Sequence, residues 1–228
     1  MRVLGLETTG NAVGAALVSG EEVLAEAWVA GPQQHCRELV PLIDWCLSRA
    51  GLTLAEVEGV AVALGPGSFT GLRIGLATAK ALALVTGAPL VGVPSLEVAA
   101  AAVGAFSGLV CPALWSRPGE VYWALLRKGK EGWEYLVPPG ALGAAALAGK
   151  LAEREEEVVL CGEAARAVAE AAAASGRRLN LAPATGRRLL AAEVACLGRA
   201  RLVAGHRDDS LRLQPLYLRP PGITWPRR

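Results

Sequence analysis

The sequence is poor in the side chains that most enzymes use to bind metals and to transfer protons. Its 228 residues include two histidines, His35 and His206, and its aspartates are limited to Asp44, Asp208 and Asp209. The histidines lie far apart and form neither an HExxH nor an HxxxH pair, so a zinc site would need ligands from distant segments. We interpret His35 as a polar residue near a helix start, and we predict no metal site in this chain.

Cysteine pairs and long apolar runs are missing as well. The five cysteines form no CxxC motif, and their odd number is typical of buried free thiols in a reducing cytosol. The opening stretch MRVLGLETTG turns polar too soon for a signal peptide, and no apolar run is long and uninterrupted enough to favour a membrane span. We therefore expect a cytoplasmic protein that makes no membrane contact.

The chain also has little excess of positive over negative charge. The formal net charge is +2, which is too small to indicate nucleic-acid binding by charge alone. Apolar residues make up 53% of the chain and charged residues 19%, a balance that is typical of a compact globular protein.

The predicted elements occur in the same order in the two halves of the chain. The first half reads as the strands RVLGLE, AVGAALV and VLAEAWVA, a helix over 35–50, a strand over 59–64, a helix after a glycine-rich turn, the strand PLVGV and the helix LEVAAAAV. The second half reads as the strands LVCPALW, EVYWALLR and WEYLV, a helix near 141–153, the strand VVLCG, a helix near 163–175, the short strand LNLA and a helix near 187–204.

This repetition predicts an α/β protein with two lobes, residues 1–106 and 107–228, each β-β-β-α-β-α-β-α with a mixed sheet flanked by helices. Thr53 and Glu56 match a capping box that opens a short helical turn. The tail from residue 206 is rich in proline and arginine, and its leucines favour docking of at least its first half.

A glycine-rich loop follows the fourth strand of the first lobe. It consists of Gly65, Pro66, Gly67, Ser68, Phe69 and Thr70. The loop has no GK[ST] ending, and its glycines do not follow the GxGxxG spacing, so it matches neither of these two nucleotide-binding motifs. Backbone amides at a helix start could still hold an anion, but a tight strand-to-helix turn is the favoured interpretation.

The helix after this loop carries a stripe of small residues, Gly71, Gly75, Ala79 and Ala83, at intervals of four. Glycine inside a helix costs about 1 kcal/mol relative to alanine, so the stripe predicts the close approach of another backbone. The neighbour is either the 35–50 helix of the same chain or a helix of another subunit, and the two interpretations are compatible.

Several motifs, taken together and in order, match a known family. GPGSFTGLRIG, the upstream ETT at a strand end, HCRELVPLI, the central GEVYWA and the terminal PLYLR resemble the TsaB (YeaZ) family of the actin-like ATPase superfamily. The resemblance covers nearly the whole chain. It implies that the two lobes are actin-like, that is, ribonuclease-H-like.

The resemblance also implies a function. The chain would be a non-catalytic scaffold and activator subunit of the complex that transfers a threonylcarbamoyl group to adenosine 37 of tRNAs reading ANN codons. A TsaD-like catalytic subunit would pair with helices of the first lobe, a TsaE-like ATPase would join them, and the chain alone would form a homodimer through the same surface. The chain would meet tRNA only through the complex. We expect no cofactor in this chain alone, ATP used by the wider complex, and a nucleotide at the subunit interface as an open question.

The helix spacing and the resemblance together predict a partner interface in the first lobe. Its residues are His35, Leu39, Leu42, Ile43, Cys46, Gly71, Leu72, Gly75 and Ala79.

The sequence departs from the family in two places. Its first strand ends in Glu7-Thr8, where the family often has Asp-Thr, and WSR followed by proline stands where many members have Asp-Ala-Arg. Glu7, Thr8, Arg117 and Glu120 are candidate polar contacts at the lobe junction.

Two other functions stay open. One is a metal-dependent peptidase or an actin-like-superfamily kinase that acts alone, against which the scarcity of histidine and aspartate counts. The other is a stand-alone homodimeric binding protein.

Overall fold

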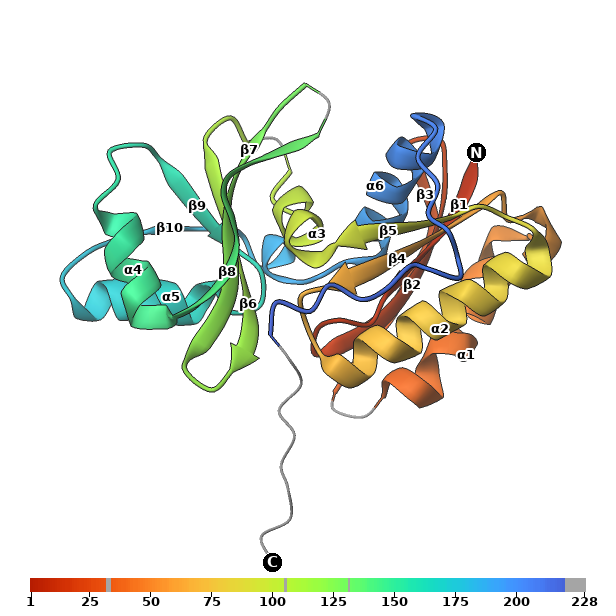
Figure 1. Cartoon of the computed structure of the whole chain (residues 1–228), viewed down its shortest axis with the longest axis horizontal. Helices are drawn as coiled ribbons and strands as arrows, with labels where there is room; N and C mark the ends of the chain where they lie inside the picture. The colour runs from red at the N-terminus through yellow and green to blue at the C-terminus, as the bar shows by residue number, and fades with distance from the viewer. Residues whose placement is uncertain (32–33, 105, 131, 220–228) are drawn as a thin grey trace, which may run out of the picture.

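Two five-stranded sheets, one from each half of the chain, organise the structure (Figure 1). The computed structural model describes residues 1–31, 34–104, 106–130 and 132–219. The first sheet contains β1 (Arg2–Glu7), β2 (Ala12–Ser19), β3 (Glu22–Ala30), β4 (Gly59–Gly65) and β5 (Leu90–Pro94). Its order is β3-β2-β1-β4-β5, with the first three strands antiparallel and β1, β4 and β5 parallel. The central strands β1 and β4 are almost entirely buried because helices cover both faces of the sheet.

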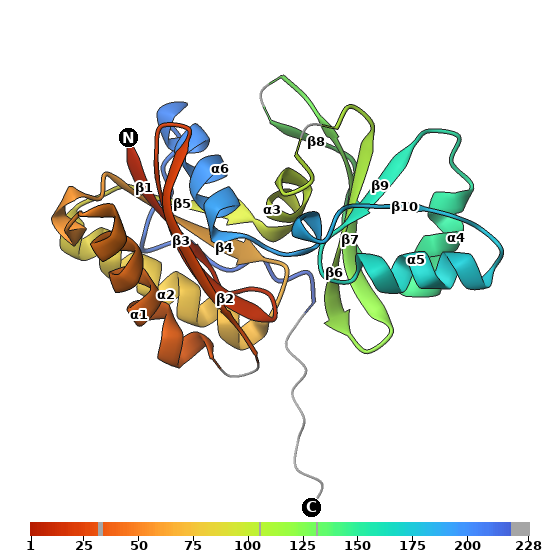
Figure 2. The same cartoon turned by 180° about the vertical axis from the view of Figure 1, so that it is seen from behind.

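Three helices cover the first sheet. Helices α1 (His35–Ala50) and α2 (Phe69–Thr86) lie side by side on one face, which Figures 1 and 2 show from opposite sides. The other face is covered by α6 (Ala191–Val203), the last helix of the chain. Glycines allow this close packing, because a β-carbon at Gly5 would lie 2.5 Å from the carbonyl oxygen of Ala191.

The second sheet has the order β10-β9-β6-β7-β8. Its strands are β6 (Leu109–Arg117), β7 (Glu120–Lys128), β8 (Trp133–Gly143), β9 (Val158–Cys161) and β10 (Asn180–Leu181). The helices α4 (Ala144–Ala152) and α5 (Ala165–Ala174) pack against its outer side. On the inner side, α3 (Ser95–Ala101) lies between the two sheets within a core shared by both halves.

The structure confirms the predicted fold class and the repeated element order. In each half, the first three strands are antiparallel, and the fourth and fifth run parallel to the first. This is the ribonuclease-H-like arrangement. Pro41 lies inside α1 without ending the helix. The lobe boundary at 106/107 stays a prediction, and the structure adds that α6, from the second half, packs on the first sheet.

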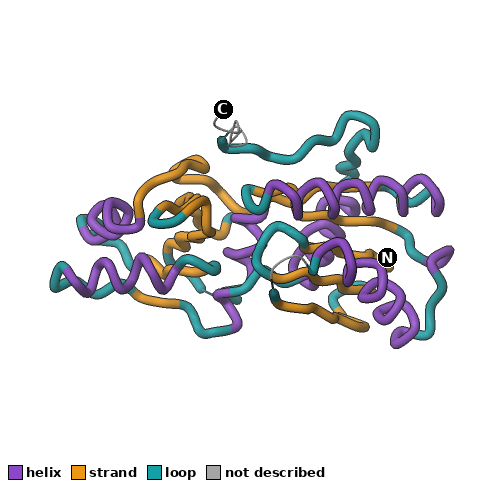
Figure 3. Tube along the Cα trace, turned by 90° about the horizontal axis from the view of Figure 1, so that it is seen from below, coloured by secondary structure: helices purple, strands orange, loops and turns teal. Residues whose placement is uncertain are grey.

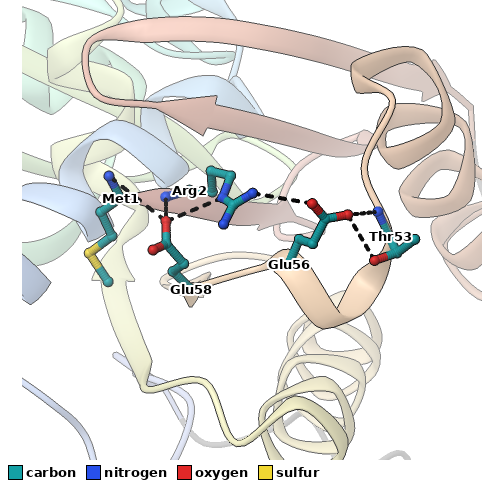
Figure 4. Close-up of polar contacts among 5 residues, drawn as sticks. All are labelled: Met1, Arg2, Thr53, Glu56 and Glu58. Carbon is teal, nitrogen blue, oxygen red and sulfur yellow. Dashed lines mark hydrogen bonds and ion pairs between the residues drawn. The ribbon is translucent and has the colours of Figure 1, made fainter.

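The predicted capping box is present (Figure 4). The backbone nitrogen and Oγ1 of Thr53 both donate to Oε2 of Glu56 at 2.9 Å, at the start of the short 3-10 helix η1 (Leu54–Glu56). Arg2 connects this turn to the start of the chain, since it pairs with Glu56 at 3.4 Å and with Glu58 at 3.3 Å. The same Glu58 also accepts a hydrogen bond from the backbone nitrogen of Arg2.

After α6 the tail returns along the first lobe, beside α2, and reaches the junction between the lobes (Figure 3). The backbone nitrogen of Asp208 donates to the carbonyl oxygen of Leu90, and Leu213 packs against the first-lobe core. The predicted docking of the first half of the tail is thus confirmed, while residues 220–228 lie outside the described part of the chain.

Candidate functional site

A cavity of about 690 Å³ lies between the lobes. Four segments from both halves line most of its wall: the loop after β1, the glycine-rich loop, the end of β6 and the tail. The lining residues in these segments are 9–11, 66–69, 115–117 and 216–219. Only some of the residues predicted at the lobe junction reach this cavity. Arg117 lines it, whereas Glu7 and Thr8 are buried beneath the loop after β1.

Glu7 belongs to a buried polar cluster at the end of β1. Its Oε1 accepts hydrogen bonds from the backbone nitrogen of Thr9 at 2.5 Å and from Oγ1 of Thr9 at 2.7 Å. Ser95 extends the cluster, because its Oγ lies 2.9 Å from Oγ1 of Thr9 and accepts from the nitrogen of Gly65 at 3.1 Å. Burial raises the pKa of Glu7 from 4.5 to about 7, although the Thr9 hydrogen bonds oppose the shift. The carboxyl therefore holds the loop in shape and does not face the cavity.

The glycine-rich loop is a turn that is fixed to the loop after β1. Gly65 has φ of +102°, a conformation that favours glycine, and the nitrogen of Ser68 donates to the carbonyl oxygen of Thr9 at 2.8 Å. A β-carbon at Gly67 would overlap this carbonyl group. Oγ of Ser68 accepts from the nitrogen of Gly71 at 3.2 Å and so caps α2. These contacts give the loop glycines a packing role within the subunit.

The small-residue stripe of α2 faces the loop after β1. Oγ1 of Thr8 donates to the carbonyl oxygen of Gly71 at 2.8 Å, and β-carbons at Gly71 and Gly75 would overlap Thr8. The sequence predicted the close approach of a backbone but did not identify this neighbour. At Gly71 and Gly75 the close neighbour is Thr8, the residue that follows β1, and not α1. Contact of this stripe with another subunit stays a prediction.

The predicted interface residues on these helices need a correction for the same reason. Apart from His35, which is half-buried with its Nε2 3.2 Å from the carbonyl oxygen of Gly10, all of them are buried in the folded subunit. Helical periodicity identified the face that packs on the subunit's own sheet, since apolar residues at that spacing mark a core face first. These buried residues are Leu39, Leu42, Ile43, Cys46, Gly71, Leu72, Gly75 and Ala79.

The outward faces of α1 and α2 carry large apolar side chains that the sequence did not single out. Val40 and Trp45 on α1 are 62% and 43% exposed, and Leu84 and Val85 on α2 are 84% and 77% exposed. We call these four residues the helical apolar face. The sequence does contain a signal for them, because they are large hydrophobic residues at helix positions outside the buried apolar stripe.

On the second lobe, Glu120 is the centre of a polar cluster. Oε2 accepts from Arg117 at 3.2 Å and from Arg219 of the tail at 2.9 Å, and Oε1 accepts from Oγ of Ser116 at 3.0 Å. Partial burial works against ionisation, but these hydrogen bonds and the two arginine charges hold the pKa of Glu120 below its ordinary value. The two predicted junction residues of this lobe, Arg117 and Glu120, are therefore paired with each other.

Glu163 joins the lobes and was missed by the sequence analysis. Its Oε1 accepts a hydrogen bond from the backbone nitrogen of Asn11 at 3.0 Å, and burial raises its pKa. It follows β9 in the second half, and no motif marks it. Its contact with Asn11 can be recognised only from the arrangement of the two halves in the structure.

Among the residues that the structure describes, no three His, Cys, Asp or Glu side chains gather where they could hold a metal ion. Helix α2 is long and apolar enough, by length and composition, to cross a membrane, with a mean hydropathy of 1.3. No apolar run in the sequence had led us to expect such a segment. One such helix is weak evidence for a membrane protein, because a core helix of a soluble protein passes the same test.

Comparisons with known proteins return both a TsaD family model and relatives named TsaB. Residues 30–214 match the family described as TsaD: tRNA N6-adenosine threonylcarbamoyltransferase. The chain is 34% identical over 134 residues to the tRNA threonylcarbamoyladenosine biosynthesis protein TsaB of Escherichia coli, a match that covers 58% of each chain. It is 32% identical over 162 residues to the protein of the same name from Bacillus subtilis, which covers 71% of each chain. The match to the first of these relatives thus spans less than two thirds of its length.

The solved structure of YeaZ from Pseudomonas aeruginosa has the same fold. It superposes with a TM-score of 0.79 at 22% identity, over 95% of this chain and 99% of that one.

Proposed function

The chain belongs to the TsaB (YeaZ) family of tRNA threonylcarbamoyladenosine biosynthesis proteins, and from this premise we propose that it is a non-catalytic scaffold and activator subunit that pairs with a TsaD-type catalytic subunit. In this proposal the subunit acts in the cytoplasm, on adenosine 37 of tRNAs reading ANN codons. A TsaE-type ATPase joins the complex, and tRNA is met only through the assembled complex.

The helical apolar face supports the position of the partner. Val40, Trp45, Leu84 and Val85 lie on two adjacent helices, and desolvating large apolar side chains is a main source of affinity at such interfaces. The proposed interface therefore stays on α1 and α2 but moves to their outward sides. The homodimer expected for the isolated chain would use this same surface.

The buried Glu7 supports the non-catalytic part of the proposal. Oε1 of Glu7 is used by the Thr9 backbone and hydroxyl, and Glu7 is not among the residues that line the cavity. A carboxylate that activates a nucleophile or holds a substrate-bound metal must reach the reacting atoms. Glu7 instead supports the loop against which α2, the partner-facing helix, is packed.

Reconstituted tRNA modification tests the function. We expect threonylcarbamoyladenosine to form when this chain, a TsaD-type subunit, a TsaE-type subunit, the threonylcarbamoyl donor and ATP are combined, and to fall sharply when this chain is omitted. Product formation that is independent of this chain would contradict the proposal, and so would transfer by this chain without the TsaD-type subunit.

Substitutions on the helical apolar face test the position of the partner. We expect Trp45→Glu and Leu84→Glu each to weaken binding to the TsaD-type subunit by at least about tenfold, as charge at a hot spot does. The matched control is Leu136→Glu, because Leu136 is 42% exposed on β8 of the other lobe. Unchanged binding in both helix variants, measured by calorimetry on folded protein, would remove α1 and α2 from the interface.

A further inference from the structure

The described tail, residues 206–219, lines the inter-lobe cavity at its far end, and its attachments to the two lobes differ. Residues 216–219 line the cavity together with segments of both lobes. The tail reaches this place from the first lobe, where it runs beside α2 (Figures 1 and 3). The strength of each attachment decides which lobe the tail would leave first.

The first-lobe attachment combines backbone hydrogen bonds with packing. The nitrogen of Leu216 donates to the carbonyl oxygen of Leu64 at 2.7 Å, and Leu213 packs on the first-lobe core. Tyr217 lies on the first turn of α2, with its ring 5.4 Å from that of Phe69. Arg73 closes this contact, because its guanidinium sits 3.9 Å above the Phe69 ring and its Nε donates to the Tyr217 hydroxyl at 3.4 Å.

Among the residues that the structure describes, the polar attachment of the tail to the second lobe is an ion pair near the surface. Nη2 of Arg219 lies 2.9 Å from Oε2 of Glu120, and the Arg219 side chain is 40% exposed. Arg117 competes for the same oxygen at 3.2 Å. Exposed ion pairs contribute little and are screened by salt, so this contact is much weaker than the packed attachment on the first lobe.

We propose that residues 206–219 form a strap across the cavity mouth, which opens at its second-lobe end while it stays docked on the first lobe. The latch is the contact between Arg219 and Glu120. When it opens, the lobes are released at the mouth, and access to the loop after β1 increases. The strap therefore sets the opening of the cavity, independently of what the subunit binds.

Two backbone amides report the two parts of this proposal separately. The Asn11 amide is hydrogen-bonded to Glu163 of the other lobe, so its hydrogen exchange measures separation of the lobes. The Leu216 amide is hydrogen-bonded to Leu64, so its exchange measures release of the strap from the first lobe. Both can be followed by NMR on the intact chain.

The test compares Arg219→Ala with Arg212→Ala. Arg212 lies in the same strap but pairs only locally with Asp209, at 3.5 Å, and its side chain is 90% exposed. We expect Arg219→Ala to raise Asn11 exchange about twofold to fivefold, the range for losing a surface ion pair, and to leave Leu216 exchange unchanged. Arg212→Ala should change neither amide. In the unsubstituted protein, about 1 M salt should mimic Arg219→Ala, because screening is then nearly complete within a few ångströms.

Each other outcome overturns the proposal. Unchanged Asn11 exchange in Arg219→Ala would mean that the contact is not a latch. A joint rise at Asn11 and Leu216 would mean that the strap leaves both lobes together. An equal effect of Arg212→Ala would mean that strap charge acts without regard to position.

Discussion

The two lobes share an element order but differ where the fourth strand turns into a helix. In the second lobe, Gly162 at φ +84° packs on β6, where the nitrogen of Ala164 donates to the carbonyl oxygen of Ala113 at 3.0 Å. The alanines of α5 follow, and their β-carbons are accommodated. In the first lobe Thr8, which follows β1, lies so close to α2 that β-carbons at Gly71 and Gly75 would overlap it. The glycines of α2 are therefore explained by its close contact with the loop after β1.

Adding a side chain at Gly71 gives the largest expected effect of this difference. A β-carbon there would overlap the carbonyl oxygen of Thr8, which belongs to a buried backbone and cannot move aside cheaply. We expect Gly71→Val to lower the free energy of unfolding by about 3 kcal/mol or more, the cost of forced overpacking. Urea unfolding followed by circular dichroism measures this loss. An unchanged midpoint would mean that the loop does not press on α2.

The carboxyl groups of Glu7 and Glu120 should respond to pH in opposite directions. The folded pKa of Glu7 is raised to about 7, so folding is favoured while the group is protonated, and this stability is lost as the pH rises from 4.5 through 7. The pKa of Glu120, in contrast, is lowered.

Replacing Glu7 with glutamine isolates its contribution. At 1.36 kcal/mol per pKa unit, the loss that the parent protein suffers over this pH range is about 3 kcal/mol, and Glu7→Gln should abolish it. The stability of both proteins is measured by urea unfolding at a series of pH values. Glu163 also has a raised pKa and stays in both proteins, so only the difference between the two curves belongs to Glu7. Parallel curves would exclude Glu7 as the source.

A smaller effect is expected where the lobes are held together away from the cavity. The Tyr135 hydroxyl on β8 donates to Oε1 of Glu97 on α3 at 3.1 Å, and Oε2 of Glu97 pairs with Arg201 on α6 at 2.7 Å. We expect Tyr135→Phe to cost about 1 kcal/mol of stability, the net value of one hydrogen bond. Thermal unfolding provides the measurement. A loss as large as that of Gly71→Val would mean that the lobes depend on this contact far more than its geometry indicates.

The smallest expected effect has the opposite sign. Gly149 lies in α4 of the second lobe, and a β-carbon added there would meet no atom within 4 Å, so no neighbour requires glycine at this position. We expect Gly149→Ala to stabilise the protein by about 0.5 to 1 kcal/mol through helix propensity alone. A loss of stability, measured in the same urea experiment as Gly71→Val, would show that the glycines of both helices are constrained.

The sequence predicted the fold well because its signals are local. Strands such as RVLGLE and VAVAL are apolar runs bounded by turn residues, and Gly51 and Gly87 adopt the left-handed conformation that ends α1 and α2. The capping box of Thr53 and Glu56 is equally local. Each of these features is specified within a few residues of the chain.

The site was harder to predict because its contacts join distant segments. The pairs Thr8 with Gly71, Asn11 with Glu163, and Arg219 with Glu120 are separated by 63, 152 and 99 positions. Periodicity identified the apolar stripe of α1 and the small stripe of α2, but it could not distinguish a subunit's own core from a partner. The partner interface that we propose therefore uses other residues than those predicted from the sequence, although both sets lie on α1 and α2.

The packing of α6 on the first sheet has a consequence for synthesis on the ribosome. Gly5 and Gly198 mark close contacts between this sheet and a helix that is made about 190 residues after β1. A nascent chain that has only reached the end of the first repeat has α3 but not α6 on one face of its sheet, so the part of that face that α6 covers is still exposed to solvent. The first lobe is therefore translated first, but it is completed only after α6 has been made.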